Sequence, residues 1–244
     1  MLVSHSKKFI YTKTVKTAGS SVKTYFEPYC FPDGAWEKSN PREEHISEYG
    51  IVGRGYRGAA AKGVYTYTNH MSAHKIKEKV GDDVWNDYFK FCVVRNPFDK
   101  LVSEFYWERN VRIDKTLPTK IKKILKKILR RPGVLDDIDH PDAVKAFRSW
   151  IARGGGNVDR DKYVMDGKIC VDYVIFQENL QEGIKEVCSI LDIPFKLEEI
   201  PSLKSGIREQ KLSLSELYDQ QTIERVKEKF NFELEHFGYS FPVK

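Results

Sequence analysis

The stretch that decides the fold is YFKFCVVRNPFDKLVS, residues 88–103. Residues 88–94 are almost all apolar, which is typical of a central strand that is covered on both faces. Asn96 and Pro97 then begin a helix, because asparagine is a favoured N-cap and proline a favoured first helical residue. A buried strand that leads directly into a helix indicates an α/β protein.

A second turn from strand to helix lies near the N-terminus. Residues 8–14 (KFIYTKT) alternate in character and predict a short strand, and residues 16–21 (KTAGSS) predict a Gly/Ser loop before a helix that begins near Val22. Such a loop aims backbone N–H groups and hydroxyls at an anion, and Lys16 adds a full positive charge. An ordinary polar turn is the alternative. The Walker A pattern is absent from the sequence, which disfavours ATP-type chemistry.

Further strands and helices alternate along the chain. We therefore expect a three-layer α/β/α arrangement around a central, mostly parallel sheet. One domain is expected to span residues 1–244, with a variable basic-helix insertion around residues 108–160. The other predicted strands are residues 64–68 and 171–176, and the other predicted helices are residues 73–79, a short one at 84–85, 143–152, one from Leu180, and one from a Ser213–Glu216 capping box toward Phe230.

A second candidate anion site follows the central strand. Arg95 lies at the carboxyl end of this strand, where ligands bind in open α/β sheets. Ser103 lies about two helical turns into the next helix and can point back toward the same crevice. An arginine with a nearby hydroxyl suits a terminal phosphate. A structural ion pair of Arg95 is the alternative.

Taken together, the KTAGSS and VVRNPFDKLVS segments resemble the sulfotransferases that use 3′-phosphoadenosine 5′-phosphosulfate (PAPS). They are most similar to the carbohydrate branch, which includes heparan sulfate 2-O-sulfotransferase and many bacterial relatives. The resemblance implies a P-loop-like sulfotransferase fold without a Walker A motif. It is weakest over residues 104–165, and it continues over residues 87–91, 172–180 and 237–241.

The resemblance also implies roles for individual residues. Arg95 and Ser103 would bind the 3′-phosphate of PAPS, and Lys16 would take part in catalysis as well as in binding. Gln177 departs from the family pattern, because relatives often carry arginine there, which puts any contact of that arginine in doubt. The residues that would bind the 5′-phosphosulfate are Lys16, Thr17, Ala18, Gly19, Ser20 and Ser21.

A late loop contains Lys204, Gly206 and Arg208. It resembles the segment that closes over the nucleotide in members of the family. A solvated basic loop is the alternative.

The candidate general base is His70, in the segment NHMSAH at residues 69–74. A neutral imidazole can accept the proton of a hydroxyl, and this segment resembles the His-x-Ser-Ala stretch of bacterial relatives. A histidine without the two anion motifs would be taken as structural. We expect His74 to be structural or to line the substrate site.

The expected reaction is a direct in-line transfer of the sulfuryl group from PAPS to a hydroxyl of a carbohydrate or glycolipid. The nucleotide product is 3′,5′-ADP. Because PAPS is already activated, neither a metal nor a covalent intermediate is expected. The alternatives are a non-catalytic nucleotide- or polyanion-binding module and a P-loop kinase, the latter disfavoured by the missing Walker A motif.

The basic character of the chain is local. The formal net charge of the chain is +6. Residues 115–131 contain eight basic residues and no acidic one, so the net charge of the rest of the chain is slightly negative. This distribution argues against nucleic acid as a partner. Residues 118–131 place apolar residues on one helical face and lysines on the other. This helix could dock on the domain, form a wall for an anionic glycan, or rest on an anionic membrane surface.

Composition and cysteine usage predict a cytoplasmic, soluble protein. The 244 residues are 41% hydrophobic, enough for a core, but no apolar run is long enough to span a bilayer and no signal peptide is evident. The four cysteines form no CxxC pair and no metal-ligand spacing with the histidines. We expect reduced thiols and no metal site.

Overall fold

The computed structural model describes residues 1–39, 42–55, 65–112, 142–201 and 212–242. The chain forms two compact units. The first comprises Met1–Arg95 and Asp159–Leu203, and the second comprises Asn96–Val158 and Lys204–Lys244. The predicted single domain over the whole chain stays a prediction.

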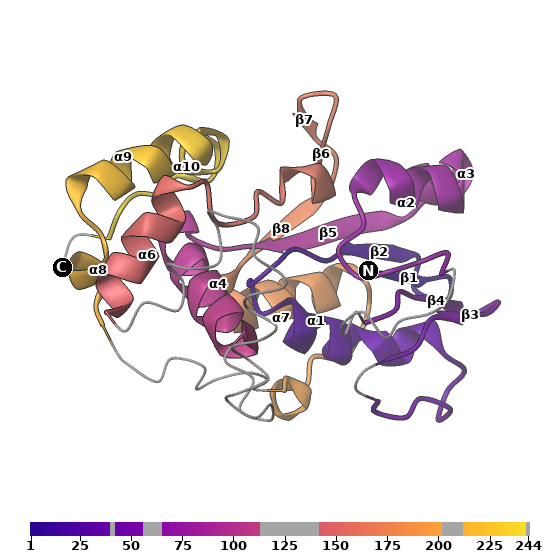
Figure 1. The fold of residues 1–244 in the computed structure, drawn as a ribbon. Helices are drawn as coiled ribbons and strands as arrows, with labels where there is room; N and C mark the ends of the chain where they lie inside the picture. Colours follow the sequence, from indigo (N-terminus) through magenta and orange to yellow (C-terminus); the bar gives the residue numbers. More distant parts are fainter. Residues whose placement is uncertain (40–41, 56–64, 113–141, 202–211, 243–244) are drawn as a thin grey trace. The chain divides into compact units, whose positions relative to one another are not determined.

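The first unit is built on a six-stranded sheet in the order β3-β4-β1-β2-β5-β8 (Figure 1). The strands β2, β5 and β8 are parallel to one another, whereas β3, β4, β1 and β2 pair in antiparallel fashion. The bounds are β1 Leu2–Ser4, β2 Phe9–Thr12, β3 His45–Ile46, β4 Gly50–Val52, β5 Phe89–Val94 and β8 Tyr173–Phe176.

Strand β5 is the central parallel strand, as its apolar sequence predicts. Phe91 pairs in register with Tyr11 of β2 and with Tyr173 of β8. Its ring also contacts those of Phe9 and Phe26, at centroid distances of 5.7 and 5.1 Å. These aromatic contacts tie the first strand–helix connection to the middle of the sheet.

Helices cover both faces of this sheet (Figure 1). On one face, α1 (Gly19–Phe26) and α7 (Leu180–Ile190) pack against the side chains of Phe9, Phe91 and Ile175. On the other face, α2 (Ala73–Val80) and α3 (Asp82–Asp87) pack against Val3 and Ile10. Because successive strand residues point to opposite faces, β1, β2 and β4 each supply side chains to both cores. The predicted α/β/α layering is confirmed.

The second unit is helical and has an aromatic core. Phe98, Phe147 and Tyr218 pack within it, and the Tyr218 hydroxyl donates a hydrogen bond of 2.9 Å to the carbonyl of Phe98. The side-chain oxygen of Asn96 accepts the N–H of Phe98, which confirms the predicted helix start. Among the described residues, its helices are α4 Pro97–Arg112, α6 Ala143–Ala152, α8 Leu214–Leu217, α9 Gln220–Lys229 and α10 Asn231–Phe237.

Smaller elements complete the two units. In the described part of the first unit, a hairpin and four short 3₁₀ helices are also present. They are β6 Val164–Met165, β7 Lys168–Ile169, η1 Glu27–Cys30, η2 Arg160–Lys162, η3 Gln177–Asn179 and η4 Leu197–Glu199.

Two predictions were wrong. The described part of the expected strand at residues 64–68 is irregular, and Thr68 forms only an isolated bridge with Arg54. The last helix is also not continuous. The capping box at Ser213 begins only the short α8, and Asp219 then caps the separate helix α9. The predicted helix at 118–131 and the residues Lys204, Gly206 and Arg208 lie outside the described residues.

We expect Gly183→Ala to destabilise the first unit. A Cβ at Gly183 would lie 2.6 Å from Cγ2 of Ile175, so α7 would have to move away from β8. Overpacking costs about 1–3 kcal/mol, whereas the helix propensity of alanine returns at most about 1 kcal/mol. Chemical denaturation should therefore show a lower free energy of unfolding. The exposed Lys185→Ala on the same helix is the control and should change it by less than about 0.5 kcal/mol. Equal stabilities for both variants would contradict the close packing.

Candidate active site

The loop between β2 and α1 has a constrained backbone. Lys16 and Ala18 both adopt the left-handed conformation, with φ of 61° and 60°. Non-glycine residues rarely adopt this conformation, and it persists only where the surroundings hold it. Here Thr14 and Thr17 share a hydrogen bond of 2.7 Å between their hydroxyls, and the N–H of Val15 donates to the buried carboxylate of Asp159 at 2.9 Å.

The loop ends in the N-terminus of α1. Lys16, Thr17 and Ala18 precede the helix. Gly19, Ser20 and Ser21 form its first turn. No acidic residue lies in this turn and no side chain caps it. The first N–H groups of a helix lack partners within the helix and carry partial positive charge. This end of α1 is therefore suited to an anion, as the sequence predicts.

Arg95 contacts the same loop. It follows the last residue of β5, and its Nη1 donates a hydrogen bond of 2.9 Å to the carbonyl of Lys16. The two anion motifs predicted from the sequence are thus joined through Lys16 and Arg95 in the first unit. Ser103 lies in α4 of the second unit, so its sharing of a phosphate with Arg95 stays a prediction.

His70 is held against the backbone of this loop. It lies in a turn before α2, with φ of 62°, and its Nδ1 is 3.0 Å from the carbonyl oxygen of Lys13. Because a carbonyl can only accept, Nδ1 carries the proton. In the neutral ring, Nε2 is then the proton acceptor. This is the tautomer that a general base needs.

The surroundings keep His70 neutral. Burial, and next the positive charge of Lys13, lower the pKa of His70 from 6.5 to about 3. Desolvation and a nearby cation both disfavour the imidazolium form. The side chain is therefore uncharged across the physiological range of pH.

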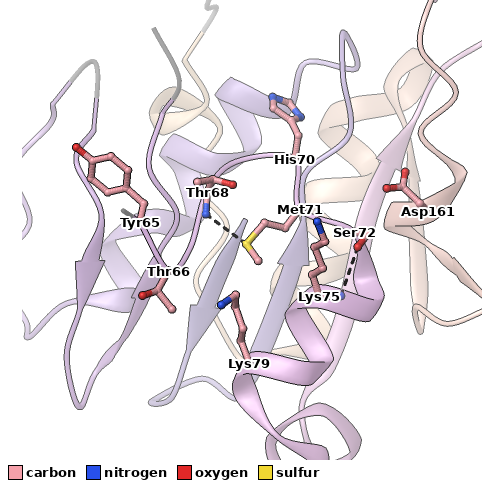
Figure 2. A pocket seen from close by; sticks show the side chains of 9 residues that line it. All are labelled: Tyr65, Thr66, Thr68, His70, Met71, Ser72, Lys75, Lys79 and Asp161. Atoms are coloured by element: carbon pink, nitrogen blue, oxygen red, sulfur yellow. Dashed lines mark hydrogen bonds between the residues drawn. The ribbon is translucent and has the colours of Figure 1, made fainter. Parts of the chain in front are cut away.

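A pocket of about 360 Å³ opens beside His70 (Figure 2). Lys75 and Lys79 extend into it from α2, one turn apart, and Asp161 lies at its other side. His74, on the same helix, is exposed and does not line it. The lining residues are Tyr65, Thr66, Thr68, His70, Met71, Ser72, Lys75, Lys79 and Asp161.

The sequence did not indicate three of these features. Lys13 falls within the expected strand at residues 8–14, but it follows β2, is buried, and lies next to both the loop and His70. Asp159 supports the loop from far along the chain, and no local pattern marks it. The lysines of the pocket belong to an ordinary amphipathic helix.

The described residues contain no cluster of histidine, cysteine and acidic side chains that could hold a metal ion. They also contain no helix long and apolar enough to cross a membrane.

Comparison with known proteins gives one family and one curated relative. An uncharacterized protein of Archaeoglobus fulgidus is 25% identical over 128 residues, which are 52% of this chain and 88% of that protein. No solved structure matches. The profile of the Sulfotransferase family matches residues 1–240, which include both anion motifs and His70. The chain therefore belongs to the sulfotransferase family.

Proposed function

We propose that this protein transfers the sulfuryl group of PAPS to a hydroxyl group of a carbohydrate. Membership of the sulfotransferase family supports sulfuryl transfer in general. The observation that carries the proposal is the hydrogen bond between Nδ1 of His70 and the carbonyl of Lys13. It joins the candidate base to the loop that would bind the donor. Because Nδ1 makes this hydrogen bond, the unprotonated Nε2 remains to accept a proton.

The donor site proposed here uses the loop from Lys16 to Ser21. The N-terminal turn of α1 and the ammonium of Lys16 would bind the 5′-phosphosulfate, and the absence of acidic residues from this turn supports the assignment. Arg95 and Ser103 would bind the 3′-phosphate. PAPS itself supplies an activated sulfuryl group with a good leaving group.

The proposed step is a direct displacement. Nε2 of His70 accepts the proton of the acceptor hydroxyl while the hydroxyl oxygen forms a bond to sulfur. The bond from sulfur to the bridging phosphate oxygen breaks, and its electron pair leaves with 3′,5′-ADP. Lys16 and the N–H groups of α1 stabilise the negative charge on the sulfuryl and phosphate oxygens. Neither an electron transfer nor a covalent enzyme intermediate is needed.

The pocket beside His70 is our candidate for the acceptor site. Its lining combines the hydroxyls of Thr66, Thr68 and Ser72 with the ammonium groups of two lysines. Such a surface favours a ligand with several polar groups, which supports a glycan or glycolipid acceptor.

The cytoplasmic location also stays part of the proposal. It is supported by the four cysteines, all of which are free thiols.

We expect His70→Asn to lower kcat at least about 100-fold, the usual contribution of a general base. The asparagine amide can still donate to the carbonyl of Lys13, but it cannot take the proton of a hydroxyl. The assay measures 3′,5′-ADP released from PAPS with acceptors from a panel of polysaccharides and glycolipids. His74→Asn, in the exposed histidine, is the control and should retain full activity. Near-normal turnover in His70→Asn would remove the base from the mechanism. A wild-type protein that binds 3′,5′-ADP but sulfates no acceptor would favour the non-catalytic module.

The ¹⁵N chemical shifts of the imidazole ring should show His70 neutral, with the proton on Nδ1, from pH 8 down to about pH 5. The reason is the low pKa of about 3, which leaves the ring unprotonated until the solution is strongly acidic. The signal is assigned by its loss in His70→Asn. A titration of this signal with a midpoint near 6.5 would contradict the lowered pKa.

Arg95→Ala should weaken the binding of 3′,5′-ADP about tenfold or more, because a charge-assisted hydrogen bond to phosphate is lost. Binding of 5′-AMP, which lacks the 3′-phosphate, should change much less. Calorimetric titration measures both. An equal loss for the two nucleotides would instead indicate that Arg95 acts only by holding the loop through the carbonyl of Lys16.

A further inference from the structure

Lys13 is a buried cation beside the proposed donor site. The residue is 6% exposed, and its Nζ donates a hydrogen bond of 3.2 Å to the hydroxyl of Ser20. Ser20 belongs to the first turn of α1. The ammonium of Lys13 therefore lies at the N-terminus of this helix, although Lys13 itself precedes the predicted donor loop.

The side chain of Lys13 passes close to Gly19. A Cβ at position 19 would lie 3.2 Å from Cγ and 3.3 Å from Cε of Lys13, and 2.9 Å from the hydroxyl oxygen of Tyr11. The φ of Gly19 is not in the left-handed region, so its backbone does not require glycine. Glycine fits here because the hydroxyl of Tyr11 and the aliphatic stem of Lys13 both lie close to the start of α1.

The charge of Lys13 adds to that of the helix end. A buried ammonium next to the positive end of a helix raises the local positive potential, which favours the binding of an anion there. The effect already reaches His70, whose pKa is lowered first by burial and next by the charge of Lys13. An incoming group with two adjacent anionic oxyacid units would gain from both the ammonium and the helix.

We propose that Lys13 is a second donor-binding cation, whose ammonium binds the 5′-phosphosulfate together with Lys16. The inference rests on the proposed function. It assigns Gly19 a specific task, which is to let the stem of Lys13 reach the start of α1. Lys13 would then make two contacts in one site. Its ammonium would bind the donor, and its carbonyl accepts the hydrogen bond from His70.

The test compares two nucleotides on matched variants. Lys13→Met keeps the length of the stem but removes the charge. The control is Lys23→Met, which removes another buried ammonium, one that donates to the carbonyl of Gly53 and faces Glu27. Calorimetric titration measures the affinity for 3′,5′-ADP and for 3′-AMP, which lacks the 5′-phosphate. Thermal unfolding of each variant establishes that it is folded.

We expect Lys13→Met to bind 3′,5′-ADP about tenfold or more weakly, with 3′-AMP bound as in the wild type. Lys23→Met should bind both nucleotides normally. Wild-type affinity for 3′,5′-ADP in folded Lys13→Met, or an equal loss for both nucleotides, would overturn the role of Lys13 alone. A wild-type protein that binds neither nucleotide would overturn the proposed function and the role of Lys13 with it.

If Lys13→Met does not fold, the proposal is tested with a second pair of variants, Tyr11→Phe and the double variant Tyr11→Phe/Gly19→Ala. Tyr11→Phe removes the hydroxyl nearest to position 19, so Gly19→Ala in this background crowds mainly the stem of Lys13. The double variant should lose affinity for 3′,5′-ADP relative to Tyr11→Phe, again without loss for 3′-AMP. Equal affinities of the double variant and Tyr11→Phe for 3′,5′-ADP would contradict the proposal.

Discussion

The parallel pairing of β2 with β5 is the constraint on which the first unit depends. The register sets Tyr11 opposite Phe91 and Thr12 opposite Cys92, so both strands end at the same edge of the sheet. Two segments far apart in the sequence, the loop after β2 and Arg95 after β5, must then emerge side by side. The hydrogen bond from Arg95 to the carbonyl of Lys16 is a consequence of this register. A slip of one residue would turn each side chain of β2 to the opposite face and would separate the two motifs.

Two hydrogen bonds to backbone carbonyls hold the loop after β2 to the residue that follows β5 and to the turn before α2. Arg95 donates to the carbonyl of Lys16, and His70 donates to the carbonyl of Lys13. These contacts leave the ammonium groups of both lysines to interact with other partners. They also explain why the loop keeps two left-handed residues that are not glycine, since the loop is held from several directions at once. A rigid loop of this kind places N–H groups before a ligand arrives, and such preorganisation reduces the free-energy cost of binding.

The sequence predicted the parallel core well, because its signals are local. The apolar run before Arg95 identifies β5, and Asn96 with Pro97 marks the helix that follows. It did not predict the antiparallel half of the sheet, whose strands β1, β3 and β4 have only two or three residues and show no usable period. Aromatic and β-branched residues at 64–68 predict a strand, but Tyr67 packs into the core without forming one. The setting of Lys13 was equally hidden, because the burial of a lysine depends on residues distant in the chain.

The weakly basic imidazole of His70 has a consequence for the order of events in catalysis. Burial, and next the charge of Lys13, hold the pKa of this ring well below 6.5, which weakens it as a base. Under the proposed function, the negative charges of a bound donor would counter the field of Lys13 and increase that affinity. The base would then be stronger in the loaded protein. Donor binding and base strength would be coupled electrostatically, so that the acceptor hydroxyl meets a stronger base once the donor is bound.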